Sequence, residues 1–195
     1  MYHPISTEEV LRENAAYEAR INEAEEALSR RGFPRTAIFR QPVVWGEHDQ
    51  YQHVNNAHYI RWFESARMRW MERMSRTLSP EIASNLVRGR GVGIILASTY
   101  CRYRRPVTYP DTVVIGQAAL PMKFADRVTV RSQAYSVAQS AIVAEAYFEC
   151  VAYDYDRLCK ASLPPEVADA LRAWTYTGED KEPYCQKTSR RRTVS

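Results

Sequence analysis

Apolar residues recur along the chain with two different spacings, and each spacing predicts a different kind of element. Residues 6–31 and about 55–76 place them at three- and four-residue steps, the period of an amphipathic helix. A strand is expected at 36–45, where Pro42 indicates a sheet edge or a bulge. Further strands are predicted at about 94–103, 112–120, 127–137 and 141–154, and short helices at about 81–87 and 166–174.

Alternation within the later strands predicts which side chains share a face. Val128 and Val130 are expected to point to one side of their strand. In the next strand one face is expected to carry Ile142, Ala144, Ala146, Phe148 and Cys150, with Glu145 and Glu149 opposite. An apolar helix face satisfies an apolar sheet face when the two pack as layers. We therefore predict an α+β fold in which an antiparallel sheet wraps around one long central helix.

Composition along the chain predicts three parts. Residues 1–32 form a helical extension with a loose apolar stripe, which is expected on the surface of the domain or on a partner chain. Ser6 or Thr7 can cap this helix. Residues 33–175 form the folded domain, and the polar, basic residues 176–195 are expected to be a flexible tail. Neither terminal part contains a motif residue, so both are expected to be dispensable for chemistry.

Overall composition narrows the class of protein. The chain has 195 residues, of which 45% are hydrophobic and 26% charged, as in an ordinary globular domain. A net charge of +4 is weaker than a nucleic-acid-binding stripe, so no nucleic-acid partner is expected. No run is long and apolar enough for a membrane span.

Cysteine usage and the N-terminus bear on location. The four cysteines form no CxxC pair, which favours free thiols in a reducing compartment. The first residues lack the basic and apolar regions of a secretory signal. We therefore expect an intracellular protein, cytoplasmic, or mitochondrial if a targeting segment has been removed.

The segment from Trp45 to Arg67 carries the candidate chemistry. Asp49 lies in the loop before the long helix, and Asn55 and Asn56 lie at the first turn of that helix. A helix N-terminus exposes unpaired N–H groups, which stabilise a carbonyl oxygen that gains negative charge. A carboxylate beside that position can attack the carbonyl carbon or deprotonate a water molecule. The arrangement predicts hydrolysis of an ester or thioester without a Ser-His-Asp triad.

The same segment resembles the signature of the 4-hydroxybenzoyl-CoA thioesterase family, within the hot-dog superfamily. The matching positions are Glu47, Asp49, His53-Val54-Asn55-Asn56, Tyr59, Phe63-Glu64 and Arg67. A second element, Tyr103-Arg104-Arg105-Pro106 followed by Asp111, resembles a later motif of the family, and the resemblance covers about residues 36–160. It differs at Gln52, where the family usually has a glycine that can adopt a positive φ.

This resemblance implies a hot-dog fold and hydrolysis of an acyl-CoA to free acid and CoA. It implies that Asp49 is the nucleophile or general base and that the backbone N–H of Asn56 polarises the carbonyl. Active sites in the superfamily lie between subunits, so a homodimer or homotetramer is expected. No metal or redox cofactor is implied, and coenzyme A enters as part of the substrate.

Other candidate residues have alternative interpretations. A relative in the superfamily uses an acid at the position of Glu64, so Glu64 is a second catalytic candidate, although we favour an ion pair with Arg61 or Arg67. Asp49 itself can be a capping residue only. The substrate-binding candidates are His53, Asn55, Tyr59, Arg104, Arg105, Lys123 and Arg127. The last four are candidates for the CoA phosphates, and the alternative is a solvated charged rim.

The sequence suggests three further hypotheses. His48, His53 and His58 suggest a metal site, but their spacing does not place the imidazoles on one helix face, so no metal is expected. The same carboxylate chemistry also suits release of an acyl chain from a carrier protein. A non-catalytic hot-dog scaffold is the alternative from another class, because the extra N-terminal helix and basic tail suit partner binding.

Overall fold

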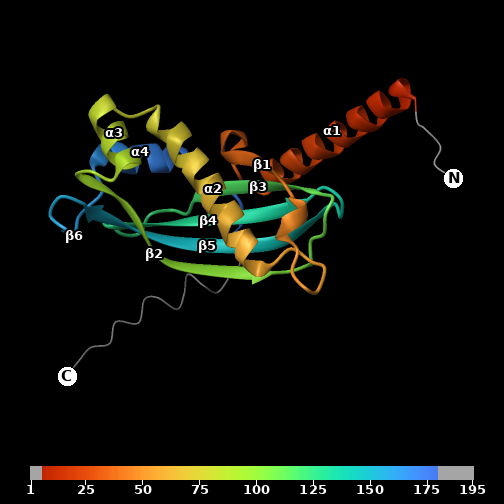
Figure 1. Ribbon diagram of the computed structural model, residues 1–195. Coiled ribbons are helices and arrows are strands. Elements are labelled where there is room, and N and C mark those ends of the chain that lie inside the picture. The colour runs from red at the N-terminus through yellow and green to blue at the C-terminus, as the bar shows by residue number, and fades with distance from the viewer. Residues whose placement is uncertain (1–5, 180–195) are drawn as a thin grey trace.

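The computed structural model describes residues 6–179 (Figure 1). Its helices are α1 (Thr7–Arg30), α2 (Asn56–Ser75), α3 (Pro80–Arg88) and α4 (Pro165–Ala173), with short 3-10 helices η1 (Arg35–Ala37) and η2 (Trp45–Glu47). Its strands are β1 (Ile38–Pro42), β2 (Val92–Tyr103), β3 (Thr112–Ala119), β4 (Arg127–Ser136), β5 (Ala141–Asp154) and β6 (Cys159–Lys160). Every helix and strand predicted from the sequence is present, and β6 and the 3-10 helices are additional.

The strands form one antiparallel sheet in the order β1-β3-β4-β5-β2, with β6 paired to the end of β5. The long helix α2 lies across one face of this sheet (Figure 1). Phe63, Trp70 and Met74 of α2 are almost completely buried against strand residues such as Val128 and Phe148. The predicted α+β arrangement of a sheet around a central helix is therefore confirmed.

Two polar contacts determine where α2 begins and how it is held on the sheet. The side chain of Asn55 accepts a hydrogen bond from the Ala57 N–H at 2.9 Å, so the helix begins one residue after this cap. In its middle, the buried Gln117 side chain of β3 donates to the carbonyl of Phe63 at 2.7 Å. The position of the first turn of α2, on which the site depends, is therefore tied to the sheet.

Helix α1 covers the opposite face of the sheet. Its residues Ile21, Ala24 and Leu28 are buried in a second apolar cluster that includes Val114 and Tyr147. Alternate residues of β3 belong to the two clusters, so the sheet is buried on both faces at this point. The predicted extension is thus a packed third layer of its own domain.

A bulge changes the face of one predicted residue in β5. Val128, Val130 and most of the predicted β5 positions point toward α2 as expected. The pairing shifts between Ala134 and Tyr135, so Val143 is an extra residue, and Ile142 packs in the cluster under α1. The prediction for Ile142 was wrong because strict alternation does not survive an inserted residue.

The packed chain continues beyond residue 175, after which the sequence predicts a flexible tail. The Tyr176 N–H donates to the carbonyl of Ala119 at 2.7 Å, and the Thr177 N–H donates to the carbonyl of Gly32 at 3.1 Å. The Tyr176 ring lies 4.9 Å from that of Phe33. The rest of the predicted tail, 180–195, lies outside the described residues. No helix within 6–179 is both long enough and apolar enough to cross a membrane.

Candidate active site

An open hollow of about 680 Å³ lies where the β1–α2 loop, the first turn of α2 and the end of β2 meet. Its walls include seven of the predicted site residues: Asp49, His53, Asn55, Asn56, Tyr59, Arg104 and Arg105. Tyr51, Val54, Tyr103 and Pro106 complete them. Two separate motifs of the sequence therefore meet in one place.

Asp49 orders its own turn and retains a free carboxylate oxygen. Its Oδ1 accepts a hydrogen bond from the Tyr51 N–H at 2.8 Å, and its carbonyl accepts one from the Gln52 N–H at 3.0 Å. The Asp49 N–H donates to the carbonyl of His53 at 2.9 Å. No group within the described residues bonds to Oδ2, and Asp49 is half-buried at the wall of the hollow. The turn role and a chemical role are thus compatible.

Gln52 adopts the backbone conformation that a glycine would favour. Its φ is +62°, in the left-handed region, although its side chain makes this conformation less favourable than for glycine. The departure from the family signature therefore leaves the turn between Asp49 and His53 in a glycine-like geometry.

The N-terminus of α2 presents one uncommitted backbone donor to the hollow. The cap residue Asn55 uses its side chain on the Ala57 N–H and its carbonyl on the His58 N–H at 2.9 Å. The Asn56 N–H has no acceptor in the described part of the chain, and Asn56 is exposed at the hollow. This N–H carries part of the positive end of the helix dipole, so it can stabilise an oxyanion.

Glu47 connects the loop to the helix. Its Oε1 accepts from the Trp62 indole N–H and its Oε2 from the Val44 N–H, both at 2.8 Å. The carbonyl of Glu47 accepts from the Asn55 N–H at 2.9 Å. The sequence identifies Glu47 only as a motif match, because its contact with Trp62, 15 residues later, depends on the tertiary structure.

Two tyrosines, Tyr59 of α2 and Tyr103 of β2, line the hollow and contact each other. The Tyr103 hydroxyl donates to the carbonyl of Asn56 at 3.1 Å, and its ring lies 5.2 Å from that of Tyr59. Burial raises the pKa of Tyr59 to about 12, and partial burial together with the neighbouring Cys101 and Tyr59 raises the pKa of Tyr103 to about 12, so both hydroxyls stay protonated at neutral pH. Tyr103 was missed as a site residue, because a strand position does not indicate contact with a helix end.

The predicted phosphate-binding cations separate into different settings. Arg104 lines the hollow, but its Nε bonds to the buried Glu145 Oε2 at 2.7 Å, and Arg105 lies exposed beside it. Arg127 lies outside the hollow and pairs with Asp126 and Glu149, each at 3.0 Å. Lys123 is also outside the hollow. Of the four predicted phosphate-binding cations, only Arg104 and Arg105 line the same hollow as Asp49 within one chain.

Glu64 lies on the exposed side of α2, outside the hollow. The ion pair expected with Arg61 or Arg67 is not formed among the described residues. Arg67 is instead buried, with its guanidinium 4.7 Å from the centre of the Phe148 ring. That prediction was wrong because Arg67 points into the core rather than along the helix surface.

The three histidines that suggested a metal have separate surroundings. His48 Nε2 accepts from the Tyr109 N–H at 2.8 Å, and His58 Nδ1 lies 3.7 Å from Glu47 Oε1. His53 lines the hollow. Within residues 6–179 no three His, Cys, Asp or Glu side chains are grouped to hold a metal ion.

Comparison with solved structures shows the fold. A Pseudomonas aeruginosa protein aligns with a TM-score of 0.61 at 22% identity, covering 73% of this chain and 93% of its own. A 1,4-dihydroxy-2-naphthoyl-CoA thioesterase from Synechocystis gives 0.59 at 16% identity, covering 69% and 94%. A DHNA-CoA thioesterase from Staphylococcus aureus gives 0.58 at 15%, covering 70% and 88%. These likenesses confirm the predicted hot-dog fold.

Comparison of sequences shows the family. A protein of Aquifex aeolicus (strain VF5) described as "Putative esterase" is 30% identical over 74 residues, a match that spans 38% of this chain and 53% of that protein. The model of the thioesterase-like superfamily matches residues 43–171, which include the loop, α2 and the sheet from β2 to β5. The chain belongs to the thioesterase-like superfamily.

Proposed function

We propose that this protein hydrolyses an acyl-CoA to the free acid and CoA. The observation that carries the proposal is the pairing of an available Asp49 carboxylate oxygen and an available Asn56 N–H at one hollow. Membership of the thioesterase-like superfamily supports hydrolysis of a thioester. The Synechocystis and Staphylococcus aureus structures of the same fold are CoA thioesterases by name, which favours CoA as the leaving group.

The proposed reaction uses the two groups together. The substrate carbonyl oxygen accepts from the Asn56 N–H, where the helix dipole favours the negative charge that develops during attack. Asp49 either attacks the carbonyl carbon or removes a proton from an attacking water. The carbon–sulfur bond breaks, the thiolate takes up a proton to give CoA, and water supplies the oxygen of the released acid.

Tyr103 and Glu47 have positioning roles in this scheme. Tyr103 holds the carbonyl of Asn56, and Glu47 holds the residue before it. Arg104 is held by Glu145, so its contribution is to shape the wall, whereas the exposed Arg105 is the better candidate for a CoA phosphate.

A second copy of the chain is part of the proposal. One edge of the twelve-residue strand β2 pairs with β5, and no strand of the described chain covers its other edge. This strand exposes Ile95, Leu96, Tyr100 and Tyr103. A long apolar strand edge tends to pair with another chain, so we propose a homodimer joined along β2. Tyr103 lies on β2 and also lines the hollow, so the hollow would lie close to this dimer interface.

Thiol release from a panel of short, long, branched and aromatic acyl-CoAs tests the proposal. The preferred acyl group is then compared on CoA and on a carrier protein, which separates the two substrate classes. Activity toward at least one acyl-CoA is expected. A protein that is folded and dimeric but inactive on the whole panel, in both forms, would support the scaffold hypothesis instead.

A further inference from the structure

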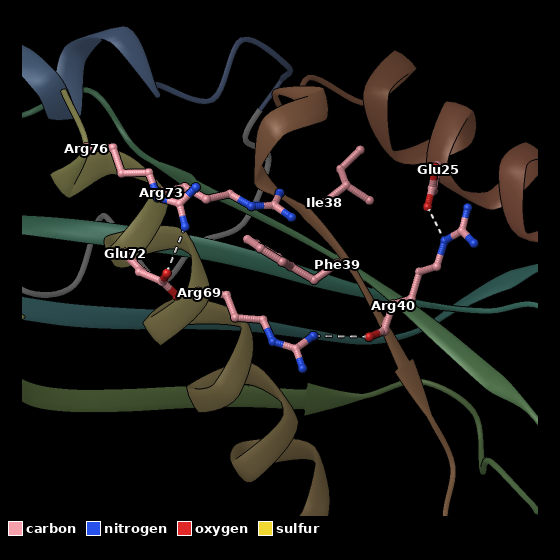
Figure 2. Close-up of a pocket in the computed structure, with 8 residues that line it drawn as sticks. All are labelled: Glu25, Ile38, Phe39, Arg40, Arg69, Glu72, Arg73 and Arg76. Atoms are coloured by element: carbon pink, nitrogen blue, oxygen red, sulfur yellow. Dashed lines mark hydrogen bonds and ion pairs between the residues drawn. The ribbon is translucent and has the colours of Figure 1, made fainter.

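A second hollow, of about 590 Å³, lies between α1, β1 and α2 (Figure 2). It is lined by Glu25, Ile38, Phe39, Arg40, Arg69, Glu72, Arg73 and Arg76. None of these residues belongs to the candidate active site. Asn56 and Arg69 lie about 20 Å apart along α2 at 1.5 Å per residue, so the two hollows are separate.

Two of the four arginines are neutralised by neighbouring carboxylates. Arg40 bonds to Glu25 at 2.6 Å and to Glu18 at 2.8 Å, both on α1. Arg76 bonds to Glu72 one turn earlier at 2.9 Å. In the described part of the chain, neither glutamate of the hollow bonds to the remaining two arginines.

Arg69 and Arg73 have no carboxylate partner in the described part of the chain. Arg69 Nη1 contacts only the carbonyl of Arg40, at 3.5 Å, and Arg73 Nη1 donates to the carbonyl of Thr36 at 2.6 Å. A guanidinium group has five N–H donors, so most donors of both side chains are uncommitted. The hollow therefore has an uncompensated positive charge.

One of these two arginines, Arg73, is also held in place. The Arg73 guanidinium lies 4.4 Å from the centre of the buried Phe39 ring, which together with the Thr36 contact fixes its plane. Arg69 is one turn earlier on the same helix face. Figure 2 shows both side chains extending from α2 toward β1, across the hollow. The fixed planar fork of Arg73 therefore loses little freedom when it binds an anion.

We propose that this hollow binds a phosphate-bearing small molecule, with Arg69 and Arg73 donating to the same phosphoryl group. A tetrahedral dianion can accept from two forks at once. An extended nucleic acid is disfavoured because Glu18, Glu25 and Glu72 flank the two free cations and repel a long polyanion. The phosphoryl group can come from free phosphates or from the nucleotide end of a cofactor such as CoA.

Calorimetric titration of the full-length protein with pyrophosphate tests the site. Binding is expected, and Arg69→Gln and Arg73→Gln are each expected to weaken it about tenfold or more, the scale for losing hydrogen bonds to a charged group. Arg61→Gln is the matched control, since Arg61 is an exposed arginine of α2 outside the hollow. It should bind as the wild type does.

A second titration with adenosine 3′,5′-bisphosphate identifies the source. Tighter binding than pyrophosphate indicates a nucleotide ligand, and equal or weaker binding indicates free phosphates. Arg69→Gln removes only one weak contact, so it should keep the wild-type melting temperature even if Arg73→Gln does not. Failure of pyrophosphate to bind, or wild-type affinity in a folded Arg69→Gln variant, overturns the proposal.

Discussion

Glu47 is expected to determine both the stability of the site loop and the rate of the reaction. Its carboxylate accepts from the Trp62 indole and from the Val44 N–H at 2.8 Å each, and its side chain is only 13% exposed. Hydrogen bonds to a charged group contribute about 1.5–3 kcal/mol each, and neutral ones about half as much. The glutamine of Glu47→Gln has only one side-chain oxygen for the two donors, Trp62 and Val44, so one of these N–H groups would face the amide NH₂ and lose its hydrogen bond.

The expected loss of stability in Glu47→Gln is about 2–4 kcal/mol. For a chain of this size, 1 kcal/mol corresponds to a shift of about 2–4 °C, so the melting temperature should fall by roughly 5–15 °C. Turnover should fall about 10- to 100-fold, because small displacements at a reacting centre are costly. Asp49 lies two residues further on, and the Asn55 N–H depends on the Glu47 carbonyl.

Calorimetric melting and thiol release measure the two effects. Trp62→Phe and the double variant complete a cycle, in which a coupling of about 1–2 kcal/mol is expected between the two side chains. Gln50→Ala, at an exposed position of the same loop, should change stability by less than about 0.5 kcal/mol. If Glu47→Gln melts and turns over like the wild type, the anchoring argument is wrong.

Three further predictions concern the loop, α1 and Tyr59. Gln52 has a positive φ, which a β-branched side chain disfavours. Gln52→Val should therefore lower the unfolding free energy, measured by urea titration, by about 1 kcal/mol or more, and Gln52→Gly should not lower it. Equal losses in the two variants would contradict the argument that the backbone is strained at this position. Residues 1–31 were expected from the sequence to be dispensable for chemistry, but their deletion uncovers the cluster under α1 and should give an aggregating protein in gel filtration; a stable, active deletion would refute this. Burial raises the pKa of Tyr59 to about 12 from an unfolded value near 10, so the folded state holds this proton more tightly than the unfolded state does. The resulting contribution to the unfolding free energy is complete below pH 10 and is lost as pH rises through 12. Over that range the wild type should lose up to about 3 kcal/mol more than Tyr59→Phe, and parallel curves would contradict the burial argument.

The elements of the fold could be predicted because the spacing of apolar residues repeats clearly over long segments of the sequence. The helix expected at 55–76 is observed at Asn56–Ser75, and the strand expected at 141–154 has those bounds. The face of Ile142 could not be predicted, because a bulge depends on the pairing with β4 and not on the strand itself. The packing of α1 also depends on a tertiary contact, since a weak apolar stripe suits a surface, a partner or a sheet face equally.

The site could be predicted where a local motif carries it. Asp49, Asn55 and Asn56 occupy one loop and helix start, and the structure places them at one hollow. Long polar side chains could not be assigned in the same way, because their partners lie on strands that are distant in the sequence. Arg104 bonds to Glu145, 41 residues later on the neighbouring strand β5, and Arg127 bonds to Glu149, 22 residues later on the same strand β5.

The central claim is that Asp49 is the reacting carboxylate, and the ratio of turnover in Asp49→Asn to that in Glu64→Gln tests it most directly. Asparagine keeps the acceptor for the Tyr51 N–H but has no charge, so the loop should remain folded. Turnover of Asp49→Asn should fall by roughly 10² to 10⁴, the scale for a positioned base, while Glu64→Gln stays near the wild-type rate. A nearly normal rate in Asp49→Asn with an inactive Glu64→Gln, both of wild-type oligomeric state, would contradict the account.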